Sequence, residues 1–120
     1  MRDYKKIKAY EVASKLVLFI YQATKNFPKD EMYGLTSQLR RAAVSIMANI
    51  AEGASRQHKK DYLNFLYIAR GSMAEVECLI QLANELGYVE DLIFKNIENL
   101  FQSLARTLYG LISAVEKEIV

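Results

Sequence analysis

The chain has 120 residues, of which 52% are hydrophobic, and its formal net charge at pH 7 is +2. This length suits one domain with a single core, and five Gly and one Pro interrupt regular structure too rarely for a fold of many turns. The longest charge-free apolar stretch, residues 42–50, is far shorter than the roughly 18 residues of a membrane span, and no signal-peptide core follows the N-terminus. A lone Cys78 cannot form an internal disulfide, so we expect one domain over residues 1–120 in the reducing cytoplasm, with no membrane partner.

The first predicted helix covers residues 8–26, where apolar side chains recur every three or four positions. These are Val12, Ala13, Leu16, Val17, Ile20 and Ala23. Pro28 ends this helix, because a proline pushes the preceding residue out of the helical backbone region.

The second predicted helix begins after Gly34 and is apolar on almost every side. One stripe consists of Leu39, Ala43, Ile46 and Ile50, and further apolar residues are Ala42, Val44, Met47 and Ala51. A surface helix normally has one polar face. The pattern therefore predicts a helix that is central in its own bundle or covered by another subunit. We expect Gly53 to end it.

The third and fourth predicted helices are longer. The third runs over residues 59–86, with Gly87 in the C′ position, and its small residues Gly71, Ala74 and Cys78 suit a close helix approach, with Cys78 packing as a small apolar side chain. Asp91 is the expected N-cap of the fourth. The fourth helix carries a bundle-seam pattern at Ile97, Leu100, Leu104, Leu108, Leu111 and Val115. Four helices with short loops predict an all-α fold, an antiparallel up-down-up-down four-helix bundle.

Few residues indicate catalysis or metal binding. The single histidine, His58, and the single cysteine, Cys78, supply too few ligands for zinc, and paired Glu-x-x-His motifs for a di-iron site are missing. The sequence contains neither of the common glycine-rich phosphate motifs. We therefore predict no catalytic residue, no metal and no cofactor, while carboxylate chemistry on the second helix stays a distant alternative.

A polar strip crosses the apolar second helix. Arg41, Ser45, Asn49 and Glu52 are spaced by four, four and three residues, so they share one face. A charge removed from water needs a partner. One interpretation is a structural polar network of Arg40, Arg41, Ser45, Asn49 and Glu52, in which Arg40 or Arg41 meets Glu52 or Glu75 across helices or subunits. The other interpretation is a contact with a ligand or nucleic acid.

Basic residues concentrate in the first half of the chain, where 12 Lys and Arg stand against 5 Asp and Glu. An antiparallel topology brings two basic clusters to one end of the bundle: Arg2, Lys5, Lys6, Lys8, Arg56, Lys59 and Lys60. Tyr4, Tyr10 and Tyr62 are interleaved with them and could stack on unpaired bases. The pattern predicts a nucleic-acid-binding rim or, alternatively, a solvated charged rim weakened by Glu116 and Glu118.

Three segments resemble a known family. They are Phe27-Pro28-x-x-Glu31-x-Tyr33-Gly34-Leu35-Thr36-Ser37-Gln38-Leu39-Arg40-Arg41-Ala42-Ala43-Val44-Ser45-Ile46, then Asn49-Ile50-Ala51-Glu52-Gly53, and finally Phe65-Leu66-Tyr67-Ile68-Ala69-Arg70-Gly71-Ser72-Met73-Ala74-Glu75-Val76-Glu77. The chain is similar along essentially its whole length to the four-helix-bundle proteins encoded in intervening sequences of bacterial large-subunit ribosomal RNA genes. Similar sequences often have proline where this one has Met47, so we expect a straighter second helix here.

The resemblance implies a five-fold homo-oligomer without a demonstrated enzymatic activity. Distant relatives are accessory subunits of diversity-generating retroelements, in which a basic pentamer engages nucleic acid and a reverse transcriptase. We therefore expect a non-enzymatic homo-oligomer, a pentamer by resemblance, that binds RNA or DNA through its basic rim. The alternative is a protein-interaction scaffold that binds a protein partner and no nucleic acid.

Overall fold

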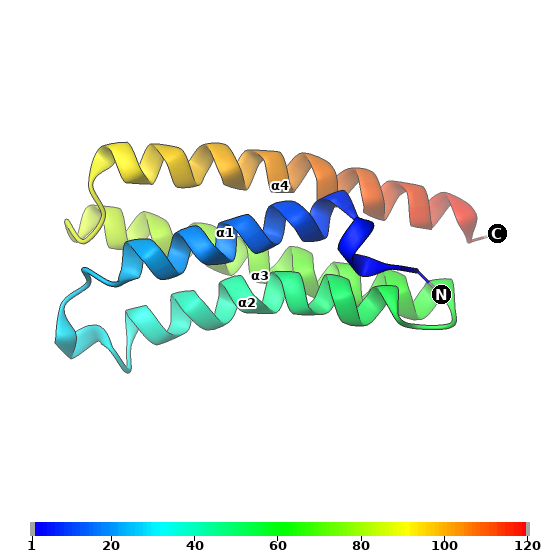
Figure 1. Cartoon of the computed structure of the whole chain (residues 1–120), viewed down its shortest axis with the longest axis horizontal. Helices are drawn as coiled ribbons and strands as arrows, with labels where there is room; N and C mark the ends of the chain where they lie inside the picture. Colours follow the sequence, from blue (N-terminus) through cyan, green and yellow to red (C-terminus); the bar gives the residue numbers. More distant parts are fainter. Residues whose placement is uncertain (1, 120) are drawn as a thin grey trace.

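Four long helices dominate the computed structural model, which describes residues 2–119. They are α1 (Lys8–Thr24), α2 (Leu35–Ala54), α3 (Lys59–Glu85) and α4 (Asp91–Glu118), and two short 3₁₀ turns, η1 (Tyr4–Lys6) and η2 (Lys29–Glu31), precede α1 and α2. Consecutive helices run in opposite directions, and α1 also packs against α4, which closes the ring of four (Figure 1). The predicted all-α antiparallel bundle is confirmed.

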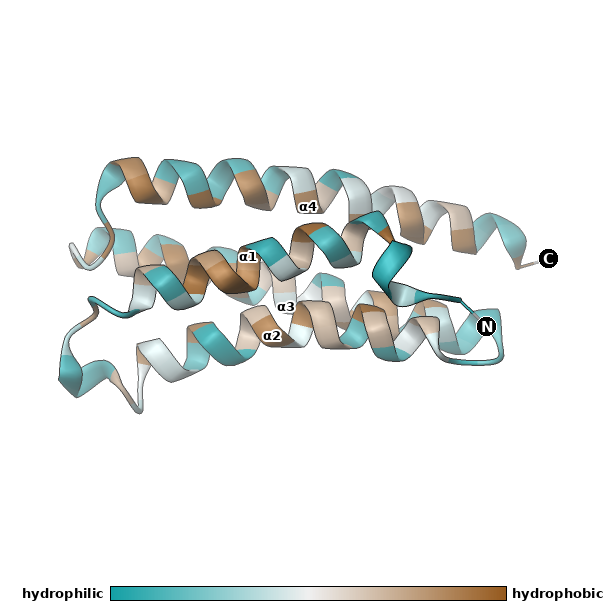
Figure 2. Ribbon diagram, in the orientation of Figure 1, coloured by the Kyte–Doolittle hydropathy of each residue, from teal (hydrophilic) through white to brown (hydrophobic). Residues whose placement is uncertain are grey.

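The core of the bundle follows the three-and-four spacing of the sequence. Each helix carries apolar residues in recurring blocks along its length, as expected when one face turns inward (Figure 2). The largest fully buried side chains are Leu16, Ile20, Leu39, Ile46, Ile50, Leu66, Met73, Val76, Ile97, Leu104 and Leu108. Within residues 2–119, none of the helices is long and apolar enough to cross a membrane.

Helix α3 ends as predicted, at Gly87. This glycine has φ +80°, and the Tyr88 N–H donates to the Ala83 carbonyl at 2.9 Å while the Gly87 N–H donates to the Asn84 carbonyl at 3.0 Å. These two bonds form a Schellman motif, which satisfies carbonyls that the helix itself leaves free. Asp91 is not the N-cap of α4: Glu90 holds that position without a side-chain cap, and Asp91 instead accepts a hydrogen bond from Asn84 at 3.1 Å.

Gly53 has a different function from the predicted helix end. Helix α2 continues to Ala54, with Ser55 as its C-cap, and Gly53 is buried against α3. A Cβ atom at this position would lie 2.7 Å from Phe65 Cβ and 3.2 Å from the Tyr62 carbonyl oxygen. The glycine is therefore required for the close approach of the two helices next to their connection.

The small-residue stripe on α3 does not make the predicted close approach within the chain. Gly71, Ala74 and Cys78 are all exposed, and a Cβ added at Gly71 would meet no atom within 4 Å. The expectation that Cys78 packs inside was wrong, because the inward face of α3 is formed by its larger apolar residues and the stripe lies on the opposite side. Helix α2 runs without interruption from Leu35 to Ala54, and Met47, the position where similar sequences often have proline, lies within it.

Candidate nucleic-acid interface

Arg2 joins the N-terminal segment to the connection between α2 and α3. Its Nη1 atom donates to the carbonyl oxygens of Arg56 at 2.8 Å and Ala54 at 3.4 Å, and its guanidinium carbon lies 4.3 Å from the centroid of the Tyr62 ring. Ala54 is the last residue of α2 and Arg56 follows its C-cap, so these carbonyls lie where a helix end leaves acceptors without helical partners. The two basic clusters that are distant in sequence therefore meet at one end of the bundle (Figure 1).

The seven predicted cations differ in how they are engaged. Arg56 pairs with Glu52 at 3.0 Å and lies over the Phe65 ring, and Lys59 is 3.9 Å from Glu118. Arg2 is held by the carbonyls described above. Among the described residues, three exposed members of the set have no carboxylate within 4 Å: Lys5, Lys6 and Lys60.

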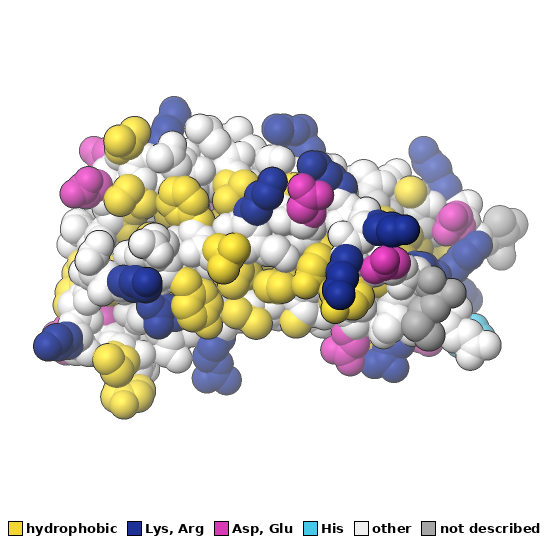
Figure 3. All heavy atoms as spheres, viewed as in Figure 1, with side chains coloured by type: hydrophobic (Ala, Val, Ile, Leu, Met, Phe, Trp, Pro, Cys, Tyr) yellow, Lys and Arg dark blue, Asp and Glu magenta, His cyan; other side chains and the backbone are white. Residues whose placement is uncertain are grey.

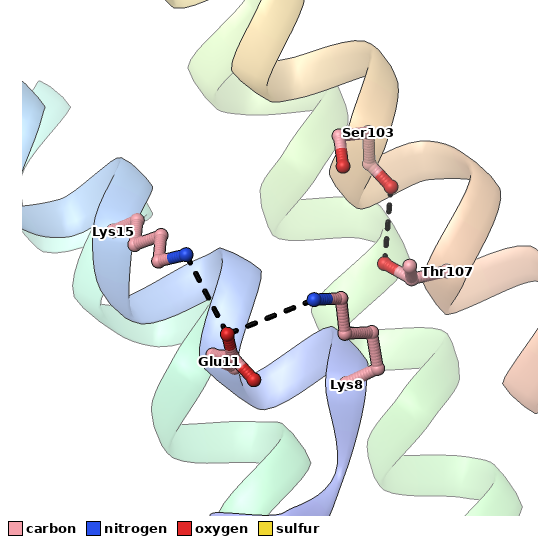
Figure 4. Close-up of polar contacts among 5 residues, drawn as sticks. All are labelled: Lys8, Glu11, Lys15, Ser103 and Thr107. Carbon is pink, nitrogen blue, oxygen red and sulfur yellow. Dashed lines mark hydrogen bonds and ion pairs between the residues drawn. The ribbon is translucent and has the colours of Figure 1, made fainter.

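Lys8 belongs to a small ion-pair group on α1. Its Nζ atom is 3.6 Å from Glu11, whose carboxylate also meets Lys15 at 3.5 Å (Figure 4). The ionic side chains of Lys8, Glu11 and Lys15 are all at least half exposed, so the group contributes little to stability. Figure 4 also shows a separate contact on the neighbouring helix α4, where the Thr107 hydroxyl donates to the Ser103 carbonyl at 3.1 Å.

The predicted tyrosines are occupied by packing. Tyr62 is only 3% exposed, and burial raises its pKa above the ordinary value. Tyr4 and Tyr10 are half-buried and meet edge to face, with ring centroids 4.8 Å apart. Since Tyr62 is enclosed, it cannot serve as the stacking platform that the sequence predicted.

Carboxylates of the C-terminal end of α4 return to the same end of the bundle, as expected. Glu116 accepts a hydrogen bond of 2.5 Å from the Tyr67 hydroxyl, and this bond raises the pKa of Tyr67. Glu118 approaches Lys59. The positive field of this end is therefore carried mainly by Arg2, whose contacts with carbonyls leave its charge unpaired among the described residues, and by Lys5, Lys6 and Lys60.

The polar strip on α2 is divided between two sets of contacts. Asn49 Nδ2 donates to the carbonyl and hydroxyl of Ser45 at 2.8 and 3.0 Å, and the Ser72 hydroxyl of α3 donates to Ser45 Oγ at 2.8 Å. Glu52 pairs with Arg56, four residues further on and just beyond the end of α2. Arg41 is exposed and has no carboxylate within 4 Å in residues 2–119, although Glu75 lines the same groove between α2 and α3.

Arg40, the remaining member of the predicted network, points toward α1. Its Nε atom donates to Thr24 Oγ1 at 2.8 Å, and its guanidinium lies 4.6 Å from the centroid of the Tyr21 ring. Within the chain the five residues thus form separate contacts rather than one network.

An apolar band lies on the outer side of α1 and α2, where hydrophobic side chains gather on the face viewed in Figure 3. Leu18 is 71% exposed, Tyr21 40% and Val44 37%, with the half-buried Met47 and Ala51 on the same side of α2. Val44 and Met47 are two of the residues that made the second helix unusually apolar. Leu18 and Tyr21 of this band were not predicted; the signal for them in the sequence is their apolar character outside the inward stripe of α1.

The described residues contain no group of side chains suited to hold a metal ion, because no three His, Cys, Asp or Glu side chains among them are grouped closely enough. Neither the family comparison nor the structural comparison below indicates an enzyme family.

Comparisons with known proteins identify the family. A family model described as 23S rRNA-intervening sequence protein matches residues 5–110. A crystal structure of a protein of unknown function from the S23 ribosomal protein family of Bacteroides thetaiotaomicron VPI-5482 is similar, with a TM-score of 0.80 and 23% identity, covering 88% of this chain and 95% of that chain. That likeness supports the fold. No curated protein matches the sequence. Because the family model spans most of the chain, this protein belongs to the 23S rRNA-intervening sequence protein family.

Proposed function

We propose that this protein is a non-enzymatic, cytoplasmic homo-oligomer, a pentamer, whose basic end binds RNA. The observation that carries the proposal is the contact of Arg2 with the Arg56 carbonyl, which holds the N-terminal segment with Lys5 and Lys6 at the same end of the bundle as the connection before Lys59 and Lys60. Lys5, Lys6 and Lys60 are the cations there that are available for phosphates. The description of the family as an rRNA-intervening sequence protein makes RNA the first ligand to test.

The apolar band on the outer side of α1 and α2 supports self-association. Its exposed residues Leu18, Tyr21 and Val44 lie beside a half-buried Met47, so a second copy would remove apolar surface from water. The number five comes from the family resemblance. Rotational symmetry would then repeat three lysines around one rim, and a multivalent rim binds far more tightly than one modest patch.

An RNA titration at several salt concentrations tests the proposal. Binding to phosphates releases counterions, so log affinity falls linearly with log salt, by roughly 0.7–0.9 per phosphate contact. Lys6→Ala with Lys60→Ala should weaken binding to every sequence and reduce the slope. Lys95→Ala with Arg106→Ala is the matched control, because both pairs remove two exposed cations that have no carboxylate within 4 Å among the described residues.

The second candidate is a protein-interaction scaffold that binds no nucleic acid. It is favoured by the ion pairs of Lys8, Arg56 and Lys59, which neutralise part of the basic end. If an intact oligomer binds neither RNA nor DNA at about 50 mM salt, where phosphate contacts are strong, the scaffold becomes the better proposal.

A further inference from the structure

A hollow of about 320 Å³ lies at the end of the bundle opposite the basic rim, between the last turn of α1, the following connection and the first turns of α2. Three cationic side chains line it: Lys25, Lys29 and Arg40. No carboxylate lines it. Glu31, in the same connection, is already engaged, since its two oxygens accept from the Leu35 N–H at 3.2 Å and the Tyr88 hydroxyl at 3.0 Å.

Arg40 is held in place at the wall of this hollow. Nε is anchored on the hydroxyl of Thr24, which is 3% exposed, and the guanidinium stacks on the Tyr21 ring. Nη2 makes only a long contact of 3.4 Å with the Tyr21 carbonyl, and no carboxylate within residues 2–119 lies within 4 Å. A positioned guanidinium with unused N–H groups is suited to bind a phosphate group through paired hydrogen bonds.

Thr36 lies beside these cations in the first turn of α2, where the helix dipole favours an anion. The residue is 8% exposed and lines the hollow, so its hydroxyl can donate a hydrogen bond to a ligand bound there. The Leu35 N–H of the same turn is already bonded to Glu31.

The remaining wall is apolar and lies beside the cations. Phe27 is buried and its ring packs 5.5 Å from that of Tyr88, while Pro28 and Met32, the latter 54% exposed, lie nearer the surface. A flat apolar group attached to a phosphate would cover this wall. Methionine adapts readily to such a partner.

We propose that this hollow binds a nucleotide, with its phosphate on Arg40, Lys25, Lys29 and Thr36 and its base against Pro28 and Met32. The nucleotide is either a free mononucleotide or one unit of a strand, and the same chemistry recognises both. The site does not depend on the basic rim, because the two lie at opposite ends of the bundle.

The experiment uses the intact protein in its native oligomeric state and calorimetric titration with three probes: a 5′-mononucleotide, inorganic phosphate and a short single-stranded RNA. We expect the mononucleotide to bind more tightly than phosphate, because only the mononucleotide covers the apolar wall. Arg40→Ala should weaken binding about tenfold or more, since it removes charge-assisted hydrogen bonds. Arg41→Ala is the matched control, because Arg41 is an exposed neighbour that lines a different groove. The affinity of this variant for the mononucleotide should stay within about twofold of the parent's.

Two milder variants protect the test against misfolding of Arg40→Ala. Lys29→Ala removes an exposed cation, and Thr36→Val removes only the hydroxyl. Each variant should bind the mononucleotide more weakly than the parent does. If the single-stranded RNA binds and the mononucleotide does not, the bound nucleotide is one unit of a strand. In that case RNA binding should be lost in Lys29→Ala and kept in the double variant Lys6→Ala, Lys60→Ala. The proposal is overturned if no probe binds at about 50 mM salt, if the hollow variants bind like the parent, or if phosphate binds as tightly as the mononucleotide.

Discussion

The hydroxyl of Tyr88 donates a hydrogen bond of 3.0 Å to Glu31 Oε2, so the connection between α3 and α4 is fixed to the connection between α1 and α2. The other oxygen of Glu31 accepts from the Leu35 N–H at 3.2 Å and thereby caps α2. The rings of Tyr88 and Phe27 pack 5.5 Å apart beside this contact. One tyrosine therefore joins three segments at this end of the bundle.

Tyr88→Phe should reduce the sensitivity of the fold to alkali. The hydrogen bond to Glu31 raises the pKa of Tyr88 above its ordinary value of 10.0 in the folded state. Its stabilising contribution is therefore complete below pH 10 and is lost as the pH rises through the folded pKa. Urea unfolding between about pH 8 and about pH 11 should show a smaller loss of stability in Tyr88→Phe than in the parent. Tyr33→Phe is the control, because its 94% exposed side chain makes no hydrogen bond in residues 2–119; equal pH dependence in parent and Tyr88→Phe would contradict the assignment.

Gly53→Ala should destabilise the bundle, whereas Gly71→Ala should stabilise it. The new methyl group at position 53 would lie 2.7 Å from Phe65 Cβ, so α2 and α3 must separate at a cost of about 1–3 kcal/mol. Gly71 lies in the exposed middle of α3, where a Cβ meets nothing within 4 Å, and alanine there gains about 0.8–1 kcal/mol of helix propensity. Thermal unfolding of both variants measures the difference, and the same sign for both would show that the crossing is looser than described.

Leu18→Asp should break the oligomer, and Leu92→Asp should leave it intact. Both leucines are 71% exposed, but Leu18 lies on α1 in the apolar band while Leu92 lies at the start of α4. A charge enclosed at an interface without a partner costs several kcal/mol. Light scattering of the parent should give a multiple of the chain mass of 13.7 kDa. A monodisperse parent of that mass would remove the basis for self-association through this band.

Glu52→Ala should change the free energy of unfolding by no more than about 0.5 kcal/mol, because an exposed ion pair is weak. Glu52 and Arg56 form such a pair, and both side chains are more than two-fifths exposed. Chemical denaturation checks the value. A much larger loss would restore Glu52 to a buried network, which within an oligomer would have to include a neighbouring subunit.

The sequence was sufficient to predict the fold because the inward residues repeat with helical spacing. Leu39, Ile46 and Ile50 were assigned to the core from this spacing, and all are fully buried. Gly87 was recognised as a helix end because few other residues adopt a positive φ. Gly53 shows the limit of this reasoning, since glycine serves equally for a turn or for a close helix crossing, and only the position of Phe65 distinguishes them.

The surface was harder to predict than the core. Residues on one face of a helix point in the same direction. Their contact partners depend on how each neighbouring helix is rotated about its own axis, and the spacing of residues in the sequence does not determine that rotation. Arg40 and Arg41 illustrate this: adjacent in sequence, they lie 100° apart around the helix, and one meets Thr24 of α1 while the other faces the groove beside α3. The hollow at Lys25, Lys29 and Arg40 was not predicted, because it combines residues from two helices and a connection.

The close crossing of α2 and α3 has a consequence for the expected order of folding. Gly53 and Phe65 meet across a connection of residues 55–58, so little chain entropy is lost in closing that hairpin. The contact of Arg2 with Arg56 spans 54 residues and requires α1 to be in place. Because contacts that are local in sequence cost little chain entropy, we expect the α2–α3 hairpin to belong to the folding nucleus and the N-terminal segment to dock last. Kinetically, we then expect Gly53→Ala to slow refolding and loss of the Arg2 side chain to accelerate unfolding, which stopped-flow measurements of both variants would check.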